Sequence, residues 1–172
     1  MNEPAESQSC WDFVVELYAK PGVSQACLEL QDRLDVDVSF LLTALFYAKR
    51  RNIEFSIEQI ASLDRSISAW RAEIIAPLRR LRRRVKDADL LSSSTEEFYR
   101  RIKADELLAE QLEINAITHQ LEQMPHAPLP HEPRRDMIKR VVTYFAESSR
   151  QQAHLADDEI ERAISILHSS AT

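Results

Sequence analysis

A run of basic residues is the part of the sequence whose side chains most clearly suggest a binding chemistry. Six of the eight positions from Arg79 to Lys86 are arginine or lysine. Cationic groups along one helix bind carboxylate or phosphate groups. On a helical wheel Arg79, Arg83 and Lys86 lie together, away from the apolar side of the helix, so these three are the predicted partner contacts. An acidic protein partner is favoured over nucleic acid because the pI is near 5.4. The structural alternative is a solvated helix face paired with nearby acids.

Two further basic residues of the same segment, Arg71 and Arg82, fall inside or beside the apolar side of the helix. A guanidinium in such a position needs a carboxylate partner or an anionic ligand, because an unpaired buried charge is costly. The acidic segment before it offers Asp32 and Asp37, among others. Two interpretations stay open at this point. The groups form a structural ion-pair network, or they line a small-ligand pocket beside Trp70.

Metal binding and catalysis have weaker support in the sequence. Glu29, Asp32 and Asp35 could face one way, but a magnesium site of this kind needs carboxylates from two separate helices. No element presents the three histidines near the proline-rich segment convergently, namely His119, His126 and His131. No serine or cysteine nucleophile has a recognisable histidine and acid beside it. No metal, cofactor or catalytic residue is therefore predicted.

Composition favours an ordinary globular domain and excludes several classes of enzyme. The chain has 172 residues, of which 44% are apolar and 29% charged. Glycine occurs once, at Gly22, which excludes the glycine-rich loops that hold phosphates and dinucleotides. The net charge of −6 is uneven, with −6 in residues 1–48, +7 in residues 49–86 and −7 in residues 87–133. A basic middle between acidic flanks can satisfy itself internally.

The location expected from these features is the cytoplasm. The first residues lack the basic and apolar regions of a secretory signal. No apolar run approaches the ~20 residues of a membrane-spanning helix. The two cysteines, Cys10 and Cys27, form no C-x-x-C pair. We expect no membrane contact, and the sequence leaves the oligomeric state open.

Every periodic segment has helical spacing, so the predicted fold is an all-α, single-domain bundle of about six to seven helices. Its central element is a long helix from Ser56 to about Lys86, with a capping box at Ser56 and Gln59. Pro77 removes a backbone hydrogen bond inside this helix and predicts a kink or a break between Ile74 and Leu78. The expected apolar seam consists of Ile60, Leu63, Ile67, Trp70, Ile74, Leu78, Leu81 and Val85.

We expect one helical domain over residues 1–172, with four parts along the chain. Residues 11–86 contain the first helices and the long central helix, and residues 87–124 contain a second long helix. Residues 125–133 form a proline-rich linker, and residues 134–172 a C-terminal helical pair. Capping boxes at Ser9 with Asp12 and at Ser94 with Glu97 are expected to open the first helix and the second long helix. Trp70 is expected to be the largest side chain that the central helix buries.

Part of the sequence resembles a known family. The stretches concerned are LYAKPGV at residues 17–23, CLELQD at residues 27–32 and DV followed by LL within residues 37–42, and the likeness continues through Trp70, Arg71, Pro77, Leu78, Arg79 and Arg83. Over residues 11–86 the chain resembles an uncharacterised proteobacterial family of short proteins with a domain of unknown function. The resemblance implies a small cytoplasmic helical protein and supplies no activity, cofactor or catalytic residue.

Taken together, these features predict a non-enzymatic helical protein that binds a protein partner or an anionic surface through its basic helix. The alternative is a small-ligand-binding or enzymatic helical domain with a polar pocket around Asp32, Arg71 and Arg82. The two hypotheses differ in whether the functional charges lie on an exposed convex surface or line a cavity.

Overall fold

The computed structural model of the chain describes residues 6–87, 94–124 and 134–171, and within these ranges the structure is helical with no β-sheet. The prediction of an all-α fold is confirmed. Residues 88–93 and the linker at 125–133 lie outside the described residues. The helices are α1 (Glu6–Tyr18), α2 (Val23–Leu34), α3 (Val38–Arg51), α4 (Ile57–Trp70), a π-helical turn η1 (Arg71–Ile75), α5 (Ala76–Asp87), α6 (Glu96–Gln123), α7 (Arg134–Ser148), a 3-10 turn η2 (Gln152–Ala156) and α8 (Asp158–Ser170).

A glycine and two short polar residues set the boundaries of the first helices. Gly22 separates α1 from α2 with a φ of 81°, a left-handed conformation that suits glycine. The Asp37 side chain accepts a hydrogen bond from the Phe40 amide at 2.9 Å and so caps α3. Asn52 ends α3 in a left-handed conformation. α1 begins at Glu6, so the expected capping box at Ser9 is wrong, because Ser9 lies inside the helix.

α4, η1 and α5 form the predicted long central helix. The Ser56 and Gln59 capping box opens it with both of its hydrogen bonds present. The predicted irregularity before Pro77 takes the form of the π-helical turn η1, in which the Ala76 amide bonds to the Arg71 carbonyl five residues back. The backbone thus accommodates the missing proline donor by widening one turn of a continuous helix.

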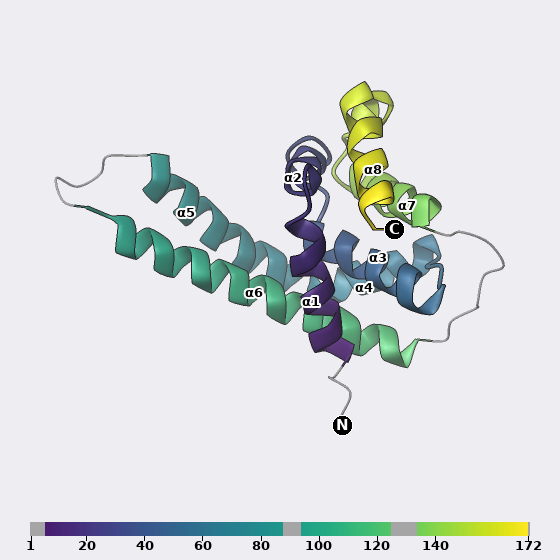
Figure 1. The fold of residues 1–172 in the computed structure, drawn as a ribbon, viewed down its shortest axis with the longest axis horizontal. Coiled ribbons are helices and arrows are strands. Elements are labelled where there is room, and N and C mark those ends of the chain that lie inside the picture. Colours follow the sequence, from purple (N-terminus) through teal and green to yellow (C-terminus); the bar gives the residue numbers. More distant parts are fainter. Residues whose placement is uncertain (1–5, 88–93, 125–133, 172) are drawn as a thin grey trace.

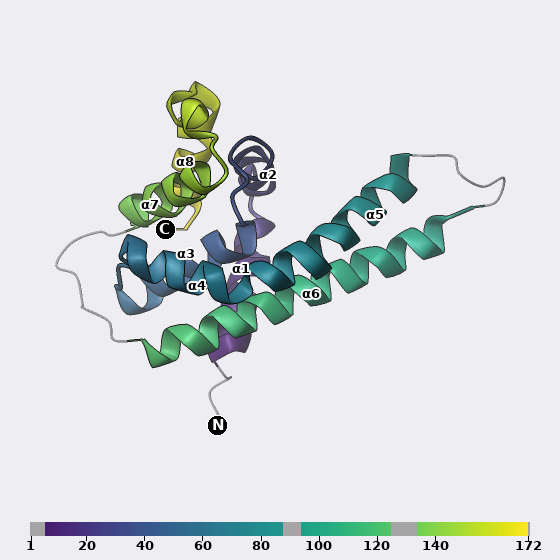
Figure 2. The same cartoon turned by 180° about the vertical axis from the view of Figure 1, so that it is seen from behind.

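The second long helix, α6, runs antiparallel to α5 and links two parts of the molecule. Its C-terminal half packs against α1, α3 and α4, whereas its N-terminal half packs against α5. Figures 1 and 2 show that α5 and this half of α6 extend away from the remaining helices. We call this helical pair the arm and the remaining helices the body. The expected capping box at Ser94 and Glu97 is wrong, because Thr95 occupies the N-cap and makes no side-chain cap.

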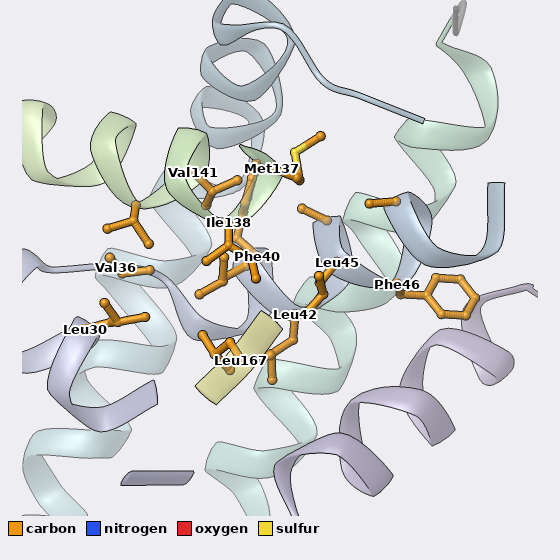
Figure 3. Close-up of a cluster of buried hydrophobic side chains, with 14 of the residues drawn as sticks. Leu30, Val36, Phe40, Leu42, Leu45, Phe46, Met137, Ile138, Val141 and Leu167 are labelled. Carbon is orange, nitrogen blue, oxygen red and sulfur yellow. The ribbon is translucent and has the colours of Figure 1, made fainter. Parts of the chain in front are cut away.

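The hydrophobic core lies in the body, around α3. Figure 3 shows Phe40 and Leu42 of α3 beside Ile138 of α7 and Leu167 of α8. α2 packs against α8, so both ends of the chain contribute to one core. Among the described residues, eleven large apolar side chains are exposed, and several of them lie on the arm. The body therefore supplies most of the hydrophobic stabilisation of the fold.

None of the described helices combines the length and the apolar character needed to cross a bilayer.

We predict that Leu42→Ala destabilises the protein by about 2–5 kcal/mol, because it opens a cavity in a site where leucine is 1% exposed. The matched control is Leu107→Ala on α6, where leucine is 50% exposed and we expect a loss below about 1 kcal/mol. Urea unfolding followed by circular dichroism measures both. Equal losses would contradict the assignment of the core to the body.

Candidate functional site

The π-helical turn decides which side chains of the central helix face inward. A π turn adds one residue to the helix and rotates the following positions by about 100° relative to a regular α-helix. Ile75 is consequently buried, whereas Ile74 and Leu81 of the predicted seam are 37% and 44% exposed. The seam prediction is confirmed at Ile60, Leu63 and Ile67 of α4 and at Val85 of α5. It is wrong at Ile74 within the turn and at Leu81 after it.

Arg71, the first residue of the π turn, lies among three carboxyl groups from three helices. Its Nε donates to Asp37 Oδ2 at the start of α3, and its Nη1 donates to Asp64 Oδ1 of α4 at 2.7 Å. Glu113 Oε1 of α6 lies 3.5 Å from Nε. We call these four residues the Arg71 cluster. It joins the central helix to the body on one side and to α6 on the other.

Aromatic residues of α7 enclose the Arg71 cluster. The Arg71 guanidinium lies over the Phe145 ring at 5.3 Å from its centroid, a cation–π contact. The Tyr144 hydroxyl donates to Asp64 Oδ2 at 2.8 Å. Burial acts to lower the pKa of Arg71, but the neighbouring carboxylates outweigh burial and raise it above its ordinary value. Arg71 is therefore a permanent cation that neutralises part of the buried negative charge.

Glu113 is the member of the Arg71 cluster that retains a proton. Its side chain is 2% exposed. Burial, followed by the negative charge of Asp37, raises the pKa of Glu113 to about 10. Among the described residues, Glu113 Oε1 and Arg71 Nη2 have no hydrogen-bond partner. One guanidinium cannot compensate three buried carboxylates, so a neutral Glu113 leaves one positive charge with two negative charges.

A second ion-pair group holds the arm together. The guanidinium of Arg79 donates to Glu106 at 3.2 Å and to Glu110 at 2.8 Å, and Arg82 Nε donates to Glu106 Oε2. Glu106 is 6% exposed and accepts from both arginines. The hydrogen bond that Arg82 donates to Glu106 raises the pKa of Arg82. These contacts fix α5 on α6, because each removes a buried charge that would otherwise be unpaired.

The structure corrects the predicted partner of Arg71. Asp32 lies at the surface and accepts a 3.4 Å hydrogen bond from Arg83, with both side chains at least half exposed. Arg71 instead contacts Asp37, and Arg82 contacts Glu106. The three residues proposed for a pocket, Asp32, Arg71 and Arg82, thus belong to three different ion-pair groups. The structural-network interpretation of Arg71 and Arg82 fits this arrangement better than the pocket interpretation.

The structure also corrects one of the three predicted partner contacts, Arg79. Arg79 was expected on the exposed side of the helix, but it is half-buried and bonded to α6, because the π turn rotates its position inward. Arg83 and Lys86 are exposed as expected. Arg80 and Arg84 are exposed as well, and with Lys86 they form no ion pair to any residue in the described ranges. We call these three cations, Arg80, Arg84 and Lys86, the cationic edge of the arm. Arg80 and Arg84 lie about 40° apart around α5, whereas Lys86 lies about 120° or more from both, near the end of the helix.

Trp70 does not fill the core as the sequence suggested. The residue is 37% exposed, and its indole Nε1 donates to the Ala109 carbonyl of α6 at 3.0 Å. The indole ring spans the joint between α4 and α6 with one edge in solvent. Its role is to connect two helices at the base of the arm.

Metal-ligand geometry is not found in the described part of the chain: no group of three or more His, Cys, Asp or Glu side chains there could hold an ion. His126 and His131 lie outside the described residues. His119 is exposed on α6 and contacts Gln123 through its ring nitrogen at 3.0 Å.

The sequence did not reveal three carboxyl groups that pair with the arginines, those of Asp64, Glu106 and Glu113. Glu106 and Glu113 share the helical spacing of two apolar neighbours, Ile102 and Ala109, at i, i+4, i+7 and i+11. An acid within such a buried stripe indicates a buried cation opposite. Asp64 carries no comparable signal, since it lies beside the buried stripe of α4.

We predict that Arg71→Met destabilises the fold by about 3–5 kcal/mol, because it leaves buried carboxylates without their cation. In a double-mutant cycle with Asp37→Asn, which keeps an oxygen for the α3 cap, the coupling should be about 0.5–3 kcal/mol. The same cycle with Asp32→Asn serves as the control and should give additive effects. Denaturant melts provide the free energies, and coupling to Asp32 but not to Asp37 would contradict the observed pairing.

The raised pKa of Glu113 predicts a pH dependence of stability. Above the ordinary glutamate pKa of about 4.3, the unfolded chain loses this proton while the folded chain keeps it until about pH 10, so stability falls as pH rises through this window. Glu113→Gln removes this contribution. The variant should gain stability relative to wild type between pH 5 and pH 9, as measured by urea unfolding at each pH. Glu122→Gln, on the exposed side of α6, is the control, and a constant difference for Glu113→Gln would refute the assignment.

Comparison with known proteins identifies the family. No curated protein and no solved structure matches the chain. One family model, described as a protein of unknown function (DUF2390), matches residues 9–117 and so includes most of α1, all of α2 to α5 and most of α6. The match contains the whole Arg71 cluster and both helices of the arm, and it extends the resemblance found over residues 11–86. The chain therefore belongs to the DUF2390 family.

Proposed function

We propose that this protein is a non-enzymatic binding module that docks an acidic protein surface through the cationic edge of its arm. The observation that supports this proposal is that some basic residues of α5 are paired with carboxylates of α6 while others are exposed and unpaired within the described residues. Arg79 and Arg82 are bonded to carboxylates of α6, whereas Arg80, Arg84 and Lys86 extend into solvent with no ion pair to a described residue. Internal pairing therefore accounts for only part of the basic run.

The position of the cationic edge favours a role in docking. It lies on the helical pair that projects from the body (Figure 2), where a partner can approach without displacing core helices. Exposed charges contribute little to folding, since a surface ion pair is worth about 0–1 kcal/mol. Such charges accelerate association and make it sensitive to salt. The same side chains are thus free to serve a partner.

Charge balance favours a protein over a nucleic acid. The chain carries a net charge of −6, and a nucleic-acid-binding domain of this size is usually strongly basic. The arm also carries exposed acids at the start of α6, Glu96 and Glu97, which would repel a phosphate backbone. A discrete acidic patch on a protein can contact Arg80 and Arg84, which share one side of α5, and avoid these acids.

The buried carboxyl groups support a structural role. Glu113 and Asp37 are enclosed by the fold and bonded to or adjacent to Arg71.

We also propose that the module acts in the cytoplasm. Both cysteines are buried in the core, and burial raises the pKa of Cys27 to about 12, which keeps it protonated and unreactive.

The test is a charge reversal at the cationic edge, Arg80→Glu, Arg84→Glu and Lys86→Glu. Because these side chains are exposed, we expect the fold to remain intact by circular dichroism. When each protein is immobilised and exposed to cell lysate, capture of the acidic protein partner by the variant should fall about tenfold or more relative to wild type. Capture by wild type should weaken as salt rises.

The matched control reverses three exposed cations outside the cationic edge, Arg65, Lys103 and Arg162, and changes the net charge equally. This control should retain the partner. Equal capture by wild type and by both variants would refute the proposal, as would equal loss in both variants, which would indicate a general charge effect. Capture abolished by added DNA would favour the nucleic-acid alternative.

A further inference from the structure

A separate surface lies on α6, along the arm. Five exposed residues of α6 fall within about 80° of the helix circumference at 100° per residue, namely Phe98, Arg101, Asp105, Leu108 and Leu112. The three apolar members are 53%, 54% and 47% exposed, respectively. We call these five residues the α6 stripe. The buried contacts of the arm with α5 come from a neighbouring sector that contains Ile102 and Glu106.

The exposure of the α6 stripe is unusual for a helix that is otherwise well packed. Phenylalanine and leucine side chains gain about 25 cal/mol for each Å² of apolar surface they bury, so a row of them along one helix favours association. Figure 1 shows that α6 extends along the arm as one uninterrupted helix. A straight exposed stripe of this kind suits a second helix better than a rounded surface.

When two copies of the α6 stripe are laid side by side in antiparallel directions, residues of one copy face complementary residues of the other. A two-fold axis that crosses α6 at the level of residue 103 relates positions whose numbers are equally distant from 103. Phe98 and Leu108 are each five residues away, and Arg101 and Asp105 are each two residues away. This single register therefore places an aromatic ring on a leucine and a guanidinium on a carboxylate, each twice.

We propose that two copies of this chain associate through antiparallel packing of their α6 stripes, with Phe98 on Leu108 and Arg101 on Asp105 of the second copy. Two-fold symmetry explains why one stripe carries both members of each pair. A parallel pairing would place like charges opposite each other at Arg101 and at Asp105, which is unfavourable. A stripe from a single helix forms a small interface, so the dimer is in rapid exchange with monomer.

Existing contacts of the α6 stripe do not compete strongly. Arg101 Nε donates a 3.0 Å hydrogen bond to Glu97 one turn away, in a pair whose side chains are 75% and 56% exposed. Such a pair contributes little because water screens it. Arg101 can keep this contact and still reach Asp105 of the second copy, since a guanidinium has five donors. This surface is distinct from the cationic edge on α5, so the dimer does not depend on the proposed function.

Sedimentation equilibrium of the full-length chain at increasing concentration tests the proposal. Wild type should show a reversible monomer–dimer equilibrium. Leu108→Glu should weaken dimerisation about tenfold or more, because it places a charge in the apolar contact. Leu107→Glu is the matched control, since Leu107 is 50% exposed but lies about 100° away on the helix, and it should dimerise like wild type.

The register is tested by exchanging charges. Arg101→Glu alone and Asp105→Arg alone each create like-charge contacts across the axis and should weaken the dimer, whereas the double variant Arg101→Glu/Asp105→Arg recreates two opposite-charge pairs and should restore it. Circular dichroism verifies that each variant is folded. A monomeric wild type overturns the proposal. Equal effects of Leu107→Glu and Leu108→Glu, or a double variant no better than the single ones, overturn the proposed packing.

Discussion

The enclosure of one guanidinium by three carboxyl groups is the interaction on which the arrangement of the helices depends. Arg71 reaches Asp37 at the start of α3, Asp64 on α4 and Glu113 on α6, and it stacks on Phe145 of α7. These groups come from segments far apart in the sequence. Because an unpaired charge in this position would be costly, the helices that carry the partners must meet at one point. The joint between arm and body is therefore set by charge compensation as well as by apolar packing.

The π-helical turn connects this joint to the surface of the arm. It begins at Arg71, before a proline that cannot donate a backbone hydrogen bond, and it rotates the rest of the helix by one residue. The rotation turns Arg79 inward onto Glu106, beside Arg82, whereas the cationic edge stays in solvent. This one backbone irregularity thus helps to determine which basic residues of α5 pair with α6 and which stay exposed. The exposed ones are those proposed to bind a partner.

Much of the fold follows from local sequence signals, whereas the site depends on contacts that no local signal specifies. The cap at Ser56 and the irregularity before Pro77 were predictable, because each involves side-chain or backbone chemistry within a few residues. The inward rotation of Arg79 was not, since a helical wheel assumes 3.6 residues in every turn. The pairing of Arg71 with Asp37 in place of Asp32 required the tertiary packing of α3. Glu113 was in principle detectable as an acid within an apolar stripe.

The most direct test of the central role of Arg71 is hydrogen–deuterium exchange, read by mass spectrometry, of wild type and Arg71→Lys. Lysine keeps the positive charge but cannot bridge several carboxyl groups with a planar fork. The account predicts faster exchange in η1, α5 and the facing part of α6, with little change in α2 and α8, whose packing does not involve the Arg71 cluster. Unchanged exchange in the arm, or an equal increase in α2 and α8, would contradict it.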